Sequence, residues 1–198
     1  MNKCLVISPV YSHVNEHTNE VMKRASLPWK QLVGCSDLVR ARSVLLTEAM
    51  NSGADRIILL DADVVPNIEQ LRDAATVDLV DPNNARFGMY TLKSNRWSVE
   101  PETEISLSHD FPIVSGGLGF VALHVESLKK VGSKMTLVLH DGVEGECWIP
   151  FCLPFMDGGQ YYPEDASLCS RLRSVGVNLT ADPTWRVGHA MHCIRTSP

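Results

Sequence analysis

The stretch Arg56-Ile57-Ile58-Leu59-Leu60, followed at once by Asp61-Ala62-Asp63, decides the fold of this 198-residue chain. A continuous run of β-branched residues and leucine is typical of a strand whose two faces are both covered by helices. Sheets of this kind bind ligands at the carboxyl ends of their strands. We therefore expect Asp61 and Asp63 at the ligand-binding edge of an α/β sheet.

Two alternations of strand and helix precede this stretch. The expected elements are a strand over residues 5–8 ended by Pro9, a return helix over 13–24, a second strand over 29–34, and a helix capped by Ser36 or Asp37 and closed at 51–53. Such an alternation predicts a mostly parallel α/β sheet.

The second half of the chain continues the pattern less regularly. The expected elements are a helix over 67–75, a strand over 86–92, a glycine-rich bend and strand within 113–123, and helices over 125–131 and 164–175. No internal repeat or linker interrupts them, so one domain is predicted.

Composition narrows the class of protein. The chain is 44% hydrophobic and 21% charged, with a net charge of −5, so it gives no strong nucleic-acid signal. The first residues form too short an apolar run for a signal peptide, and no stretch is long enough to span a bilayer. We expect a cytoplasmic protein without a transmembrane segment.

The six cysteines are scattered without CxxC pairs, which favours buried free thiols over a disulfide framework. Cys147 and Cys152 could in principle bind a metal, but no second pair lies at zinc-ligand spacing.

Asp61-Ala62-Asp63 carries the strongest chemical signal. Two carboxylates one residue apart in a turn can converge on a hard divalent cation, which would neutralise a diphosphate. A solvated acidic turn is the plain alternative.

Further polar residues could complete a site. Glu164-Asp165 begins a helix, where carboxylates serve as caps or, beside a sugar pocket, as a general base; Asp165 is the first candidate and Glu164 the next. His189 could join the metal shell, with His192 as its competitor and a structural role for both as the alternative.

Other features are weaker. Arg40 and Arg42 could direct guanidinium groups toward phosphates or simply form a solvated helix face. Gly116, Gly117 and Gly119 would allow the backbone to approach a sugar, or only turn the chain. The aromatic segment over residues 148–162 suits an acceptor-binding loop and equally suits core packing.

Taken in order, several short motifs resemble the GT-A glycosyltransferases, especially the compact domains of bacteria, phages and large viruses. The motifs are Ile7-Ser8-Pro9-Val10-Tyr11, Asp37 to Ser43, Leu59 to Asp63, Gly116 to Phe120, Tyr162 to Asp165, and Gly188-His189. Each is loose by itself, but their order covers nearly the whole chain.

The resemblance implies a single GT-A (Rossmann-like) domain over residues 1–198, with a mostly parallel mixed sheet flanked by helices. Its nucleotide-binding half would span about residues 1–92 and its acceptor and catalytic half about residues 93–198. It also implies Mn²⁺ or Mg²⁺, a nucleotide-sugar donor of the UDP-sugar class, and transfer to a glycan or other hydroxyl acceptor.

The same resemblance assigns roles to residues. The loop with Pro9, Val10 and Tyr11 would hold the nucleoside, and Arg42 would lie near the donor. The remaining assignments are Asp61, Ala62 and Asp63 at the donor and its metal, His189 at the metal, Gly116 and Gly117 near the sugar or acceptor, and Asp165 as the base of an inverting reaction. Little sequence follows His189, so an acceptor-binding extension is either missing or provided by another domain or subunit.

Three alternatives stay open. A phosphatase of the haloacid dehalogenase type would use Asp61 as its nucleophile, although such a motif normally lies near the start of the fold. A non-catalytic domain could bind a nucleotide sugar without turnover. A sugar nucleotidyltransferase is less favoured, because the N-terminal strand lacks a glycine-rich basic loop for a triphosphate.

Overall fold

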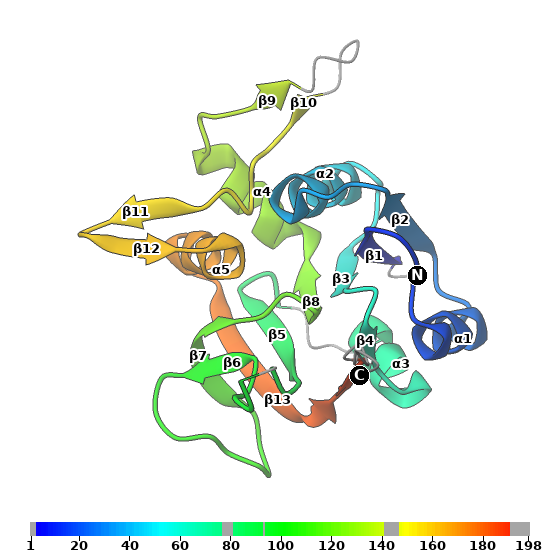
Figure 1. Cartoon of the computed structure of the whole chain (residues 1–198). Helices are drawn as coiled ribbons and strands as arrows, with labels where there is room; N and C mark the ends of the chain where they lie inside the picture. Colours follow the sequence, from blue (N-terminus) through cyan, green and yellow to red (C-terminus); the bar gives the residue numbers. More distant parts are fainter. Residues whose placement is uncertain (1–2, 77–80, 93, 141–146, 191–198) are drawn as a thin grey trace, which may run out of the picture.

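A computed structural model of the protein describes residues 3–76, 81–92, 94–140 and 147–190 (Figure 1). Eight strands form its central sheet: β1 (Cys4–Val10), β2 (Trp29–Val33), β3 (Arg56–Leu60), β5 (Asn84–Met89), β6 (Val99–Pro101), β7 (Phe111–Gly116), β8 (Phe120–His124) and β13 (Asn178–Arg186). They are arranged in the order β2-β1-β3-β8-β5-β13-β7-β6.

The sheet is mixed, as predicted, but less parallel than expected. Strand β1 pairs in parallel with β2 and β3, and β5 pairs in parallel with β13. The other pairs of neighbouring strands in the described sheet are antiparallel. The reason is that β8 follows the glycine bend and runs back between β3 and β5, so "mostly parallel" holds for the N-terminal half alone.

Five helices cover the sheet in the described residues: α1 (Glu16–Ala25), α2 (Leu38–Met50), α3 (Ile68–Thr76), α4 (Val125–Lys134) and α5 (Glu164–Ser174). Side chains from α2, α4 and α5 share one core cluster, whereas side chains from α1 and α3 share the cluster on the opposite face. The two faces of β3 are thus both covered, which explains why its five residues are all buried.

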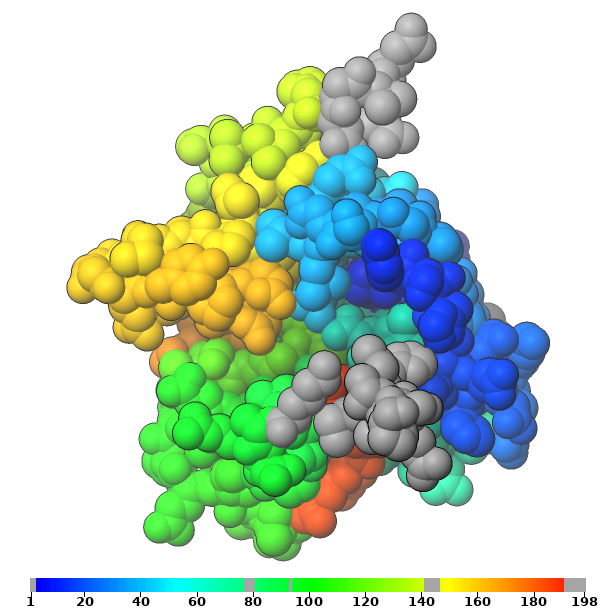
Figure 2. All heavy atoms as spheres, in the orientation of Figure 1, coloured from blue at the N-terminus to red at the C-terminus, as the bar shows by residue number. Residues whose placement is uncertain are grey.

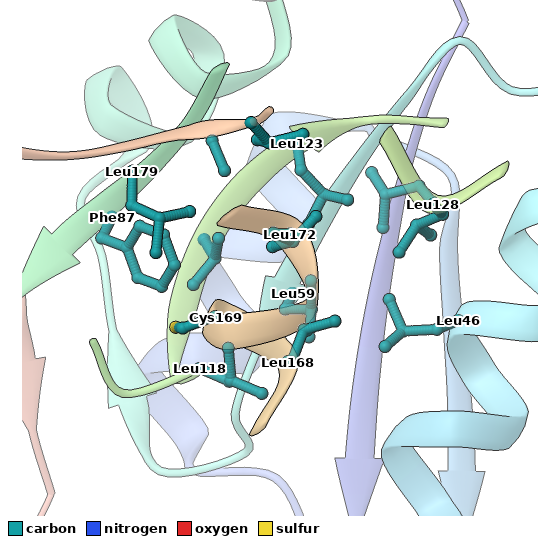
Figure 3. Packing of buried hydrophobic residues seen from close by; sticks show 14 of the residues in the cluster. Leu46, Leu59, Phe87, Leu118, Leu123, Leu128, Leu168, Cys169, Leu172 and Leu179 are labelled. Atoms are coloured by element: carbon teal, nitrogen blue, oxygen red, sulfur yellow. The ribbon is translucent and has the colours of Figure 1, made fainter. Parts of the chain in front are cut away.

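The larger core lies between α2, α4, α5 and the sheet. Figure 3 shows Leu46, Leu128 and Leu172 of these helices directed toward strand residues such as Leu59 and Leu123. Each fully buried side chain of this type contributes about 1.5–3 kcal/mol relative to the exposed state. This core fixes the strand ends that carry the polar residues.

Pro9 does not end the first strand, contrary to expectation. β1 continues to Val10 because Pro9 pairs with Leu32 of β2, while the pairing of β1 with β3 stops at Ile7. The missing N–H of Pro9 is therefore not needed on the β3 side.

Three two-stranded pairs lie outside the main sheet. They are β4 (Val64–Val65) with β14 (Gly188–His189), β9 (Leu139–His140) with β10 (Cys147–Trp148), and β11 (Phe155–Asp157) with β12 (Gln160–Tyr162). The first pair brings the late histidine next to the acidic turn that follows β3.

The prediction of buried thiols is correct for Cys4, Cys152 and Cys169 but wrong for Cys147, which is exposed, and for Cys35, which is partly exposed. Cys147 lies on the short β10 strand, away from the main sheet. Cys193 lies outside the described residues. None of the described helices combines the length and the apolar character that crossing a membrane requires.

Candidate active site

The acidic turn lies at the carboxyl edge of the sheet, beside a cavity of about 400 Å³. The first strand's loop and the start of α2 complete its wall. Six of the predicted binding residues line it together: Pro9, Val10, Tyr11, Asp61, Ala62 and Asp63. Tyr11 is 71% exposed, so its side chain is accessible to a ligand.

Arg42 lies behind this cavity and joins two of the predicted acidic residues. Its guanidinium donates to Asp61 Oδ2 at 2.7 Å and to Glu164 Oε1 at 3.1 Å, although they are 19 and 122 residues away in sequence. The Arg42 side chain is only 5% exposed. Burial by itself would lower its pKa, but the negative charges of Asp61 and Glu164 raise the pKa above its usual value.

Helix α2 directs Arg42 inward because of where the helix begins. Asp37 is the N-cap and accepts from the Arg40 backbone N–H at 3.1 Å. Arg42 then falls on the same buried side of the helix as Leu45 and Leu46. The solvated helix face considered as an alternative therefore does not apply to Arg42.

Asp63 and His189 meet across the β4–β14 pair. His189 Nε2 lies 3.3 Å from Asp63 Oδ2, and the Asp63 carbonyl accepts from the Ala190 backbone N–H at 2.8 Å. The other ring nitrogen, Nδ1, lies 3.3 Å from the Thr91 carbonyl oxygen. A carbonyl can only accept, so Nδ1 must carry a proton.

This tautomer has a consequence for the Asp63–His189 contact. With the proton on Nδ1, Nε2 of a neutral imidazole presents a lone pair to a carboxylate. Two acceptors at this distance attract each other only when a second proton or a cation lies between them. An imidazole that donates from one nitrogen to a backbone carbonyl and presents the lone pair of the other beside a carboxylate has the arrangement of a metal-ligating histidine.

Asp61 adds one more oxygen to this group. Its Oδ1 is buried and has no hydrogen-bond partner, while Oδ2 is occupied by Arg42. The carboxylate and imidazole donors of Asp61, Asp63 and His189 suit Mn²⁺ or Mg²⁺. Within the described residues, however, no three His, Cys, Asp or Glu side chains are already clustered around one metal position. His192 lies outside the described residues.

Tyr90 is a site residue that the sequence did not reveal. It follows β5 directly and is 6% exposed. Its hydroxyl accepts from the Gly119 N–H at 3.2 Å, and its ring packs edge-on against His189 with 5.3 Å between ring centroids. Gly119 in turn accepts from the Asp61 N–H at 3.0 Å. Tyr90 therefore connects the acidic turn to the histidine.

The glycine bend is explained by Tyr90. A Cβ atom at Gly117 or Gly119 would overlap the Tyr90 hydroxyl, and one at Gly116 would overlap the ring of Phe87. Gly116 and Gly117 also line a second cavity, of about 630 Å³, together with Asp165. The bend thus makes room for a buried tyrosine and forms part of a cavity wall.

The two acidic residues at the start of α5 have different surroundings. Glu164 is bound by Arg42, whereas Asp165 faces the second cavity and uses Oδ1 to accept from the Ala166 N–H at 2.7 Å. No side-chain hydrogen bond caps this helix. Asp165 is therefore the carboxylate of the pair that is not committed to an ion pair.

The aromatic segment over residues 148–162 divides between the two roles considered for it. Phe151 is fully buried and Trp148 is nearly so, which is core packing. Their segment is fixed to α2, because the Cys152 N–H donates to Ser43 Oγ at 3.1 Å. Tyr161 is 59% exposed on the β11–β12 hairpin and stays available for a ligand.

Comparison with known proteins finds solved structures of similar fold. The sequence matches no family model and none of the curated proteins. A197 from STIV is similar over 96% of this chain and 86% of its own, with 19% identity and a TM-score of 0.68. GalNAc-T7, solved with UDP, GalNAc and Mn2+, is similar over 99% of this chain but 45% of its own, with 16% identity and a TM-score of 0.50. At these identities the likeness shows the fold alone.

Proposed function

Because the chain has a GT-A-like glycosyltransferase fold, we propose that it is a metal-dependent glycosyltransferase that moves a sugar from a nucleotide-diphosphate donor to a hydroxyl acceptor. The observation that carries this proposal is that Asp63, which pairs with His189, lines a cavity at the carboxyl edge of the sheet, while Asp165 lines another cavity.

The nucleoside would occupy the cavity beside Tyr11. Residues 1–92 supply this wall, which supports the assignment of the first half of the chain to nucleotide binding. GalNAc-T7 binds UDP in a structure of similar fold, and we extend that donor class to this chain as part of the proposal. A UDP-sugar is thus the favoured donor.

The donor's diphosphate needs positive charge beside it. Asp63, His189 and the free oxygen of Asp61 would hold Mn²⁺ or Mg²⁺, which when bound stabilises charge on the departing diphosphate. The chain's own contribution is to fix these donors, through Arg42 on Asp61 and the Thr91 carbonyl on His189.

Asp165 would accept the proton of the acceptor hydroxyl. A general base needs an oxygen that is free to reach the reacting proton. Glu164 is less suited to this role because it is paired with Arg42. Asp165 lines the cavity that we assign to the acceptor. A base that acts directly on the incoming hydroxyl corresponds to an inverting reaction.

The phosphatase alternative fits the geometry less well. A nucleophilic aspartate must present an oxygen to the phosphoryl group. Here one of the two oxygens of Asp61, Oδ2, is already held by Arg42 at 2.7 Å. Asp61 is therefore better suited to support a binding site than to attack a substrate.

The test measures UDP release and sugar transfer from UDP-sugars, with binding measured in parallel. We expect Asp63→Ala to lose metal-dependent donor binding, because it removes half of the Asp63–His189 pair. We expect Asp165→Asn to keep donor binding and lose transfer, because it removes the base alone. Equal loss of binding in both variants would contradict this division, and donor binding without any turnover would favour the non-catalytic alternative.

A further inference from the structure

We propose that the acceptor is a glycan of two or more sugar units, which binds across two cavities that meet at Asp165. This inference rests on the proposed function and names the substrate class of the same site. It follows from a shared wall between the cavities, from the aromatic residues that line each of them, and from the poor fit of this surface to a peptide that binds by strand addition.

The two cavities share three residues. One is the cavity of about 630 Å³ described above, which contains Trp97, Gly117 and Asp165. The other is a third cavity, of about 440 Å³, which lies on the other side of the same carboxylate, against Tyr161 and the start of α5. The residues common to both are Glu100, Ser115 and Asp165. Each cavity is large enough for a small ligand by itself, since such sites measure about 300–1,000 Å³.

The wall between the cavities is held in place by the β6–β7 pair. Glu100 and Ser115 are partners across these strands, and Ser115 Oγ donates to Glu100 Oε2 at 3.0 Å. Asp165 stands beside them at the first turn of α5. A chain lying along this wall would pass Asp165 partway along its length, so units would extend to both sides of the reacting hydroxyl.

Aromatic residues line both cavities. Trp97 lines the larger cavity, and the Arg186 guanidinium lies 5.9 Å from the centre of its ring. Tyr161 and Tyr162 line the smaller one. An aromatic ring offers a rigid apolar face, and tyrosine and tryptophan add a polar tip, which suits the C–H faces and hydroxyls of a sugar.

The hairpin that carries Tyr161 has a rigid base. Tyr162 stacks on Phe155 with 4.7 Å between centroids and 6° between planes, and Arg171 lies 5.0 Å above the Phe155 ring. Arg171 also donates to the carbonyl oxygens of Phe151 and Leu153. Figure 1 shows β11 and β12 projecting beyond α5, and Figure 2 shows them as a separate lobe above the β6–β7 segment.

The polar groups around both cavities favour a neutral glycan over a peptide. Asn95, Ser98 and Gln160 supply amide and hydroxyl groups. The charged residues that line the two cavities are two acidic and two basic ones: Glu100, Asp165, Arg96 and Arg173. An extended peptide that binds by strand addition would need a regular sheet edge to pair with. The edge strand β6 has three residues, ends in Pro101 and shifts register there, which makes it a poor template.

The experiment compares acceptors by length. Purified protein, a UDP-sugar and Mn²⁺ are incubated with methyl glycosides of glucose, galactose, mannose or N-acetylglucosamine, with linear di- to tetrasaccharides of each, and with serine- and threonine-containing peptides. The readout is UDP released above the rate without acceptor. Within the sugar series that the enzyme accepts, we expect kcat/KM to rise about tenfold or more from the monosaccharide to the longer glycans.

Tyr161→Ala should lower the ratio of kcat/KM for the longer glycans to kcat/KM for the monosaccharide by about tenfold, because it removes the exposed ring. Met156→Ala is the matched control. Met156 is 63% exposed on the same hairpin but lines neither cavity, so the length dependence should persist.

The outcomes separate this inference from the function on which it rests. Absence of metal-dependent UDP binding by the unaltered protein would refute the proposed function itself. If UDP binds, the inference is overturned by equal rates for mono- and tetrasaccharides, by stimulation with peptides alone, or by no stimulation at all. An equal effect of Tyr161→Ala and Met156→Ala would also overturn it.

Discussion

Replacement of Arg42 by methionine tests the ion-pair network that connects the two halves of the site. Methionine has a similar length but no charge, so Asp61 and Glu164 would lose a partner at 2.7 and 3.1 Å. Removing one member of a buried ion pair costs roughly 3–5 kcal/mol. The side chains of Asp61 and Glu164 are 22% and 28% exposed, so water offsets part of this cost and we expect about 3 kcal/mol.

The assay is urea unfolding followed by tryptophan fluorescence. With a urea dependence of roughly 1–3 kcal/mol per molar, the midpoint should fall by roughly 1–3 M. Arg173→Met is the control, because Arg173 pairs with Glu102 at 3.1 Å where both side chains are well exposed. Its effect should stay below about 1 kcal/mol. If Arg42→Met costs no more than Arg173→Met, the reasoning about buried charge is refuted.

A double variant separates lost charge from lost packing. Adding Asp61→Asn to Arg42→Met removes one of the carboxylates left without a partner. The second change should then destabilise less in the Arg42→Met background than in the unaltered protein, because residues in one network do not act additively. Equal effects in both backgrounds would show that the two side chains are not coupled.

The remaining predictions concern Tyr90 and the thiols. Tyr90→Phe should lower the free energy of unfolding in urea by about 1–3 kcal/mol, because it leaves the Gly119 N–H buried without its acceptor. The variant should keep most of its Mn²⁺ affinity, since the ring still packs against His189. A large loss of Mn²⁺ affinity would contradict this. Maleimide at pH 8 should label Cys147 rapidly in the native protein, whereas burial raises the pKa of Cys152 to about 12 and keeps that thiol protonated and unreactive until the chain unfolds. The pKa of Cys152 in the folded protein lies above the ordinary value of 9.0, so the protonated thiol's contribution to the free energy of unfolding is complete below about pH 9 and is lost as the pH rises toward 12. Urea unfolding at several pH values should show this decline, and the decline should be smaller in Cys152→Ala. An identical pH dependence in the two proteins would refute the prediction.

Much of the fold was predictable because it depends on local pattern. The apolar run of β3 and the following acidic turn place the strand in a two-sided sheet, and the GT-A-like fold predicted from the order of the motifs is confirmed. The antiparallel course of β8 was not predictable in this way. It depends on which strands a segment joins after a turn, and a β-strand has the same residue pattern in either direction.

In the candidate site, too, some residues were predictable from local sequence and their contacts were not. Asp61 and Asp63 follow directly from their strand, but the partners of Asp61 do not. Arg42 lies 19 and 122 residues from Asp61 and Glu164 in sequence, so their contact depends on how the fold brings α2, the end of β3 and the start of α5 together. Tyr90 gave no motif at all, because its role arises from the space left by Gly117 and Gly119.

Calorimetric titration of UDP into the protein, with Mn²⁺ and then with a chelator, tests the central claim most directly. The account predicts UDP binding that requires Mn²⁺ and is lost in Asp63→Ala. Met156→Ala should bind UDP as the unaltered protein does, because Met156 does not line the cavity beside Asp63. UDP binding that is unchanged by the chelator and by Asp63→Ala, or no binding of UDP in any condition, would contradict it.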